Sequence, residues 1–225
     1  MITAEQRRSS THERFREQVR GDVKGVALSQ LAAGGPQSIS LNAIAKELGV
    51  SGPALYRYYA KRDDLLDDIV IDAYHDLRDA MDQAVVATTD LPDPAERMRE
   101  LARAYRRWAL EHPHRYELLF KPLFPGYDAH GEPIAEASAM LIGPALGLLG
   151  DGGTRSRLDA RPEDVDHVVR VWSRLHGIVS LEIGGTYAAM DVDADELFAT
   201  EMESVTARLA RPSTVQQGRA VPSGD

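Results

Sequence analysis

Apolar residues recur at intervals of three and four along most of the 225-residue chain, and no stretch alternates convincingly between apolar and polar residues. The first spacing places apolar side chains along one face of an α-helix, whereas alternation would be needed for half-buried strands. The sequence therefore predicts an all-α fold. With 43% hydrophobic residues, the chain has material for a core and is neither disordered, collagen-like nor a disulfide scaffold.

Proline and glycine mark where the expected helices begin and end. Asp93, Pro94 and Glu96 combine an N-cap, a proline at the first helical position and a capping-box acid, and Gly34 through Pro36 stop the first helix. We expect polar disordered tails over residues 1–10 and 212–225 and a loop over residues 121–131. The expected helices cover about 13–33, 41–48, 52–59, 62–86, 94–111, 113–120, 132–149 with an interruption at Gly143 and Pro144, 162–187 and 194–210.

Several classes of chemistry are excluded by what the sequence lacks. The chain has no cysteine, which excludes thiol nucleophiles, cysteine-ligated zinc and redox switching, and which is compatible with a reducing cytoplasm. No stretch approaches the roughly 20 apolar residues of a membrane span, and the polar N-terminal residues do not resemble a signal peptide. We expect a cytoplasmic protein with no membrane partner, no cofactor and no catalytic residues, since no nucleophile motif or phosphate-cradling loop stands out.

The charge is distributed unevenly along the chain, whose formal net charge is −9. Residues 1–62 contain ten Lys or Arg and five Asp or Glu, whereas the remaining residues contain 16 basic and 30 acidic side chains. Such asymmetry indicates a basic module that faces nucleic acid, attached to an acidic body. Short segments also fluctuate in charge by chance, so this feature carries little weight alone.

The segment from Leu41 to Tyr58 has the spacing of a helix-turn-helix motif. A small residue at Ala45 lets the second helix approach closely, Gly49 suits a tight left-handed turn, and Ser51 can cap the following helix. The apolar residues that would fill the wedge between two crossed helices are Leu41, Ile44, Leu48, Val50 and Leu55. An ordinary pair of core helices is the alternative, but the motif predicts a second helix in the DNA major groove.

Residues 38–66 resemble the DNA-binding region of the tetracycline-repressor (TetR/AcrR) family, and the resemblance covers about the first 70 residues. The family's usual ending, an aromatic pair followed by lysine and an acidic-leucine run, appears here as Tyr58, Tyr59, Lys61 and residues 63–65. The resemblance implies a helix-turn-helix domain over residues 11–62, with the motif at about 41–59. A long helix would join this three-helix domain to a helical-bundle ligand-binding and dimerisation domain over residues 63–211.

Downstream, residues 171–177 with Leu181 and Glu182 resemble the C-terminal domain type named for its Trp-His-Gly signature, as do residues 111–113 and 116–120. This resemblance implies an all-helical effector domain, dimerisation through the last two helices, and release from DNA when a small molecule binds.

Nine residues are expected to contact double-stranded operator DNA. Tyr56 offers a hydroxyl and a ring edge, Arg57 a planar donor fork for guanine or phosphate, and Lys61 a charge near the N-terminus of the long helix. Because Gly52, Pro53 and Ala54 offer few side-chain donors, direct base readout is expected to be sparse. The full set is Ser38, Ser40, Lys46, Ser51, Gly52, Tyr56, Arg57, Tyr58 and Lys61.

Aromatic residues with polar tips are the candidate lining of an effector pocket. Such residues with one histidine fit an apolar cavity with a few orienting donors, although packing within a helical core is the alternative for each of them. The candidates are Tyr105, Trp108, Tyr116, Phe120, Phe124, Trp172 and His176.

The last two helices are expected to form a four-helix interface in a homodimer. Small residues on one helix allow close approach, and helix-turn-helix proteins that read two half-sites are usually dimers. The alternative is close packing within one chain. The candidates are Gly177, Leu181, Gly184, Ala188, Phe198, Met202, Val205 and Leu209.

Two further clusters contain side chains of the types that bind metal ions. His112 and His114 lie beside Glu111 and Glu117, but the intervening proline and the lack of a matching cluster favour a helix-junction surface. The acids at the four-residue spacing of the long helix are expected to form a solvated face. They are Asp64, Asp68, Asp72 and Asp76.

These patterns together predict a ligand-responsive transcriptional regulator, expected to be a repressor, that binds DNA as a dimer and is released by a small apolar effector. The alternatives are a ligand-independent DNA-binding regulator of the same fold and, less favoured, a helical enzyme.

Overall fold

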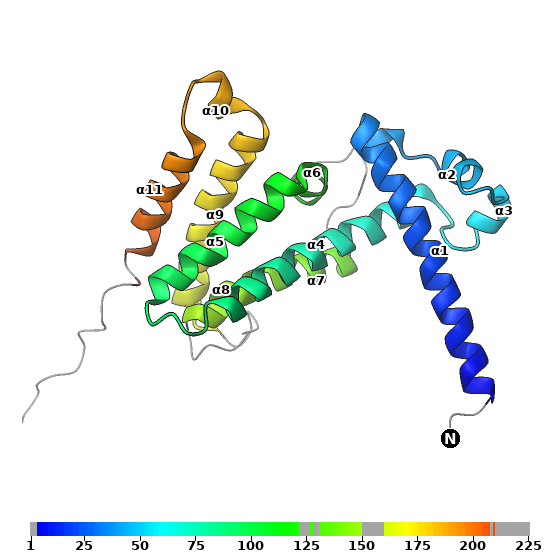
Figure 1. The fold of residues 1–225 in the computed structure, drawn as a ribbon, viewed down its shortest axis with the longest axis horizontal. Coiled ribbons are helices and arrows are strands. Elements are labelled where there is room, and N and C mark those ends of the chain that lie inside the picture. The colour runs from blue at the N-terminus through cyan, green and yellow to red at the C-terminus, as the bar shows by residue number, and fades with distance from the viewer. Residues whose placement is uncertain (1–3, 122–126, 128–130, 150–159, 208, 210–225) are drawn as a thin grey trace, which may run out of the picture. The chain divides into compact units, whose positions relative to one another are not determined.

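The computed structural model describes residues 4–121, 127, 131–149, 160–207 and 209, and within these ranges every regular element is helical (Figure 1). The all-α prediction is therefore confirmed. The elements are α1 (Ala4–Gly34), η1 (Pro36–Ser38), α2 (Leu41–Glu47), α3 (Gly52–Leu55), α4 (Arg62–Ala87), α5 (Pro94–Glu111), α6 (Pro113–Phe120), α7 (Glu132–Ala139), η2 (Met140–Ile142), α8 (Gly143–Leu149), α9 (Pro162–Ile183), α10 (Thr186–Ala189) and α11 (Ala194–Thr206).

Contacts divide the chain into two units, residues 1–79 with 108–141 and residues 80–107 with 142–225. Helices α4 and α5 each contribute to both units. The expected domain boundary near residue 62 therefore does not coincide with the division by contacts, because the first half of α4 packs with the helices that precede it.

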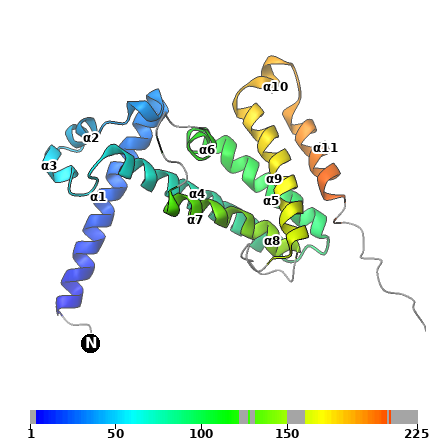
Figure 2. The same cartoon turned by 180° about the vertical axis from the view of Figure 1, so that it is seen from behind.

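In the first unit, α1 contacts η1 and α2, and α2 contacts α3 (Figures 1 and 2). Helix α1 ends at the predicted glycine pair, where Gly35 has a φ of 73° and its amide donates to the Leu31 carbonyl at 2.7 Å. The core of this unit consists of fully buried aliphatic side chains from α1, α2, α3 and α4. They include Val23, Ala27, Ile44, Leu55, Leu65 and Leu66.

The remaining helices of the first unit are tied to α4 by side chains that reach backbone carbonyls. The Tyr74 hydroxyl donates to the Leu119 carbonyl at 3.2 Å, and Arg78 Nη1 donates to the Met140 carbonyl at 2.7 Å. Because both donors are mostly covered, these bonds fix α6 and the end of α7 against the middle of α4.

In the second unit, α9 contacts α8, α10 and α11, and the views in Figures 1 and 2 show α9 and α11 side by side. An ion pair joins α5 to this pair of helices. Arg106 donates to both carboxylate oxygens of Glu182, at 2.8 and 2.6 Å, and its guanidinium lies 4.9 Å from the centre of the Phe198 ring. Both charged side chains are mostly buried, so this fork holds three helices in register.

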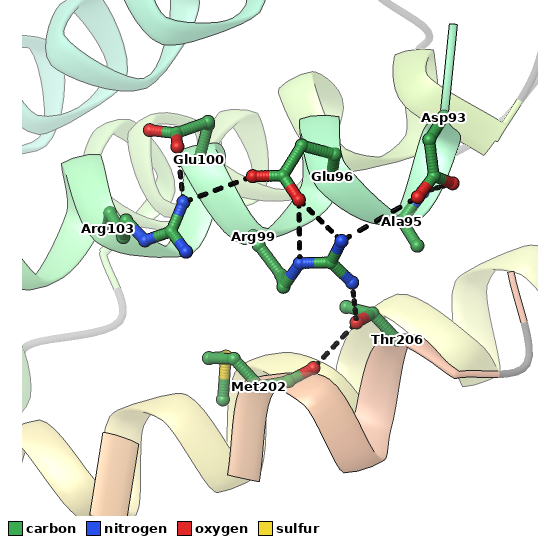
Figure 3. Close-up of polar contacts among 8 residues, drawn as sticks. All are labelled: Asp93, Ala95, Glu96, Arg99, Glu100, Arg103, Met202 and Thr206. Atoms are coloured by element: carbon green, nitrogen blue, oxygen red, sulfur yellow. Dashed lines mark hydrogen bonds and ion pairs between the residues drawn. The ribbon is translucent and has the colours of Figure 1, made fainter. Parts of the chain in front are cut away.

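A second polar cluster joins the start of α5 to the end of α11 (Figure 3). Arg99 donates to Glu96 and to the hydroxyl of Thr206 at 3.2 Å, and the Thr206 hydroxyl donates to the Met202 carbonyl at 2.6 Å. Hydrogen bonds from Arg99 lower the pKa of Glu96 below its usual range. Thr206 is fully buried, and this network satisfies its hydroxyl.

Several helices differ from the sequence predictions. Helix α1 begins at Ala4, so residues 4–10 are helical and not a disordered tail, because they contain good helix formers and no glycine or proline. Helix α3 has only four residues, and α9 ends at Ile183 because Gly185 adopts a φ of 72° before α10. The expected tail over residues 212–225 lies outside the described residues.

Two apolar residues that the three-to-four spacing would place toward a core are exposed. Phe15 is 63% exposed on α1, and Val50 is 41% exposed in the turn between α2 and α3. The three-to-four spacing selects a face of a helix but does not say how far along the helix its packing partners extend, and that explains Phe15. Val50 lies outside any helix, where helical periodicity does not apply.

Candidate nucleic-acid interface

The α2–turn–α3 segment has the geometry of a helix-turn-helix motif. The Ser40 hydroxyl accepts from the Ala43 amide at 3.4 Å and caps α2, and Gly49 adopts a φ of 67° in the turn. The apolar side chains of Leu41, Ile44 and Leu55 are buried on the inner side of the motif. The turn role predicted for Gly49 is confirmed, whereas Ser51, which was expected to cap α3, occupies its N-cap position without a side-chain hydrogen bond.

Most residues predicted to contact DNA are exposed on this motif. Tyr56 is 46% exposed, and Lys46, Ser51 and Arg57 are also exposed, whereas Gly52 and Tyr58 are partly covered. Among the described residues Arg57 has no hydrogen bond or ion pair, so its guanidinium is available to a base edge or a phosphate.

Two serines before the motif differ in what they can offer a phosphate. The Ser38 hydroxyl donates to the carbonyls of Gln30 and Gly35, at 2.5 and 2.7 Å, so its hydrogen is already engaged. The Ser40 hydroxyl accepts a hydrogen bond as the cap of α2 and keeps its own hydrogen free. Ser40 is therefore the better phosphate donor of the two.

A buried tyrosine fixes the end of this segment to α4. Tyr59 is buried, its hydroxyl donates to Asp68 Oδ2 at 2.9 Å, and the Arg20 guanidinium lies 5.6 Å from the centre of its ring. Burial, followed by the neighbouring Asp68 carboxylate, raises the pKa of Tyr59 well above its usual value, so the hydroxyl remains a donor. Arg57 and Tyr58 are thereby placed between α3 and an anchored residue.

Lys61 precedes α4 and is largely exposed, with 69% of its side chain accessible. Its backbone amide donates to Asp64 Oδ2 at 3.1 Å, and its ammonium group lies 3.8 Å from Asp64 Oδ1. Asp64 therefore caps the helix and also competes with any phosphate for the lysine charge.

The acids of α4 keep between 33% and 49% of their side chains exposed, so the face is solvated as predicted, but each acid also has a partner. Besides Asp64 at the cap, Asp68 accepts from Tyr59, Asp72 pairs with Lys24 of α1, and Asp76 pairs with Arg115 of α6. No cluster of metal-ligating side chains occurs among the described residues, here or around His112 and His114. Asp68, Asp72 and Asp76 therefore join α4 to other segments of the first unit.

The predicted effector residues fall into two groups. In the second unit, the Tyr105 hydroxyl lies 3.3 Å from His176 Nδ1, and the Trp172 ring stacks on His176 with centroids 5.1 Å apart. Burial lowers the pKa of His176, so its neutral form is favoured. In the first unit, the rings of Tyr116 and Phe120 are 4.9 Å apart.

The two other candidates are placed differently. Trp108 is buried in the first unit against His112, with ring centroids 5.5 Å apart. Phe124 lies outside the described residues.

The predicted interface residues also divide. Leu181, Gly184 and Ala188 are exposed, while Gly177, Val205 and Leu209 are partly covered, so all six are accessible to a second copy. Phe198 and Met202 are 4% and 1% exposed because they pack inside the second unit, so their assignment to an interface between copies is wrong. Helical periodicity could not distinguish the two faces of α11.

Sequence comparisons assign both parts of the chain. Residues 25–69 match the sequence model of bacterial regulatory proteins of the tetR family, and residues 98–205 match that of the tetracyclin repressor-like C-terminal domain. A relative from Mycobacterium tuberculosis, the HTH-type transcriptional regulator Rv1816, is 31% identical over 221 residues, covering 87% of this chain and 94% of its own length. The chain belongs to the TetR family of transcriptional regulators. It is therefore a regulator with a helix-turn-helix DNA-binding domain and not an enzyme.

Solved structures agree with this family assignment. The regulatory protein SCO4313 has a TM-score of 0.74 and 36% identity, with 86% of this chain and 97% of that chain covered. The TetR-family regulator PfmR from Thermus thermophilus shares the fold, with a TM-score of 0.55, 19% identity, and coverage of 84% and 98%. None of the helices in the described ranges of this TetR-family chain is long and apolar enough to cross a membrane.

Sequence reasoning missed the groups that position this TetR-family interface. Tyr59 was read only as part of the family's aromatic pair, and its partners Arg20 and Asp68 lie on two other helices. In the second unit, sequence reasoning also missed the Arg106 fork to Glu182, which spans 76 residues of sequence. The one available signal was the run of acids on α4, because buried or half-buried carboxylates need partners.

Proposed function

We propose that this regulator binds operator DNA as a homodimer, with residues 41–59 of each copy in the major groove, and acts in the cytoplasm as a repressor. The observation that carries the proposal is the exposure of Tyr56 and Arg57 on a helix-turn-helix whose apolar residues are buried. Arg57 supplies the donor fork suited to guanine or phosphate, and Tyr56 supplies a hydroxyl and ring edge.

A DNA-binding measurement tests this assignment. Replacing Tyr56 and Arg57 together by alanine should weaken specific binding by about 1–3 kcal/mol for each lost base contact. The control Arg107→Ala removes an exposed arginine of α5 and should leave affinity unchanged. Fragments retained by the unmodified protein supply the specific site, and equal retention of that site by the double variant would contradict the proposal.

The proposed homodimer uses the accessible face of α9. Leu181 is 47% exposed near the end of α9, and the exposed small residues Gly184 and Ala188 follow it, at the cap of α9 and within α10. An exposed leucine beside small residues suits close helix packing across a two-fold axis. Sedimentation showing a monomer at micromolar concentration would overturn this part of the proposal.

We further propose that a small, mainly apolar effector binds the C-terminal domain and lowers affinity for DNA. The support is the group formed by Tyr105, Trp172 and His176, which offers aromatic surface together with a hydroxyl and a neutral imidazole. Helix α4 is the element that could transmit binding, because it contributes to both units and begins directly after the motif.

A panel of alkanols, alkyl esters and aromatic alcohols tests the effector proposal. A binding compound should change tryptophan fluorescence through Trp172 and should release the operator fragment, because only differential affinity for the two states shifts the equilibrium. His176→Ala should weaken binding of that compound while affinity for DNA is retained. If compounds bind but DNA affinity stays the same, the ligand-independent regulator is the correct description.

A further inference from the structure

A basic cleft in the first unit is separate from the aromatic groups proposed to bind effector. Its volume is about 760 Å³, and it lies between α1, the segment after α3, the middle of α4 and α6. The basic residues that line it are Arg16, Arg20, Lys24, Arg57 and Arg115, and the acids among its described lining residues are Glu17 and Asp72.

Three of these cations are already neutralised in part. Their partners are three acids of α4. Arg20 lies 3.9 Å from Asp68, Lys24 pairs with Asp72, and Arg115 pairs with Asp76. Arg16 and Arg57, by contrast, have no ion pair or hydrogen bond among the described residues, and both are exposed. The cleft therefore retains unpaired positive charge contributed from two different segments.

Charged side chains outnumber apolar ones among the described residues that line the cleft. Within the described part of the chain, the apolar side chains that line the cleft are Leu28 and the ring of Tyr58, and Gly21 and Gly25 complete the wall of α1. A β-carbon added at either glycine would meet no atom within 4 Å, so the wall of α1 is open at these positions. The guanidinium forks in these walls match the oxygens of phosphate in geometry and charge.

We propose that this cleft binds a phosphate-bearing anion, held by Arg16 of α1 and Arg57 of the segment after α3. The phosphates could belong to a free small molecule such as pyrophosphate or to the backbone of the bound DNA. Arg57 is also a proposed DNA contact, so a free anion in the cleft would compete with DNA for that side chain. The DNA alternative rests on the proposed function, and the free-anion alternative does not.

The first measurement is calorimetric titration of inorganic pyrophosphate into the full-length protein without DNA. If the source is a free anion, pyrophosphate binds, and Arg16→Gln weakens binding about tenfold, the loss expected for one charge-assisted hydrogen bond. Arg107→Gln is the matched control, because it removes an exposed arginine of α5 that has no ion pair with any described residue and does not line the cleft. Unchanged melting temperatures establish that both variants fold.

The second measurement is the salt dependence of affinity for an operator fragment. If DNA phosphate occupies the cleft, Arg16→Gln lowers the slope of log affinity against log salt by about one, whereas Arg107→Gln leaves it unchanged. Effects of Arg16→Gln in both measurements would show that the two sources share the cleft.

The proposal is overturned if Arg16→Gln changes neither pyrophosphate binding nor the salt slope, or if Arg107→Gln has the same effects. Failure of the unmodified protein to bind any duplex would instead contradict the proposed function. The pyrophosphate titration alone would then test whether the cleft binds a phosphate-bearing anion.

Discussion

Individual carboxylates on α4 determine which of the neighbouring basic side chains have an acidic partner and which do not. Asp68 and Asp72 draw Arg20 and Lys24 onto the helix, whereas Arg57 is left without an acidic partner among the described residues. The spacing of the acids was visible in the sequence, but their partners lie up to 48 residues away, on other helices. Local patterns therefore predicted the solvated face but not the tertiary contacts that its acids make.

The first prediction concerns the stability contributed by the hydrogen bond between the Tyr59 hydroxyl and Asp68. Tyr59→Phe keeps the buried ring and removes only the hydroxyl, so the free energy of unfolding should fall by about 1 kcal/mol. Tyr58→Phe is the matched control, because the Tyr58 hydroxyl makes no hydrogen bond within the described residues, and its effect should be smaller. Urea unfolding measures both, and equal losses would show that the bond to Asp68 contributes no stability of its own.

The second prediction concerns the effect of His176 on the pH dependence of folding stability. Burial lowers its pKa, so at mildly acidic pH the unfolded chain takes up a proton that the folded chain resists. Stability should therefore decrease as the pH falls through about 6.5, the ordinary histidine value, and should receive no contribution from this group above it. His176→Gln should flatten that part of the pH profile, whereas His75→Gln, which replaces an exposed imidazole, should not. Parallel profiles for all three proteins would refute the assignment.

At the scale of elements, helix starts were the most predictable feature. Pro94, Pro113 and Pro162 each stand at the first position of the helix they were expected to open, because proline there loses no hydrogen bond. Helix ends and faces were less predictable. The break after Ile183 depends on the left-handed backbone of Gly185, and the inward face of α11 depends on which side α9 and α5 cover.

Two glycines in helices provide the third prediction. A β-carbon at Gly25 of α1 or at Gly177 of α9 would meet no atom of the same chain within 4 Å. Within one chain, either substitution by alanine should stabilise the helix by about 0.5–1 kcal/mol. If Gly177 faces a second copy at close approach, only Gly25→Ala should raise the melting temperature, and Gly177→Ala should lower it. Equal stabilisation by both would place Gly177 outside the interface.

At the scale of the whole molecule, the proposed dimer would link two copies of the motif. A single motif with sparse base contacts gains affinity mainly from phosphates, whereas two linked motifs engage two half-sites about 34 Å or a multiple of it apart. The family resemblance allowed this organisation to be predicted, since no pattern within one chain specifies where a second copy docks. The exposed face of α9 narrows the choice, because Phe198 and Met202 of α11 are occupied within the chain.

The fourth prediction separates dimerisation from folding. Leu181 on α9 and Leu110 on α5 are 47% and 41% exposed, so arginine at either position leaves the core of a single chain intact. Leu181→Arg places a charge in the proposed interface and should give monomers in sedimentation velocity, while Leu110→Arg should remain dimeric. Binding to one half-site should be similar for both variants, because the motif is unaltered. On a fragment with two half-sites, Leu181→Arg should lose the additional affinity of linked binding, since its second motif must bind as a separate molecule. A dimeric Leu181→Arg, or one that retains full affinity for the two-site fragment, would place the interface elsewhere.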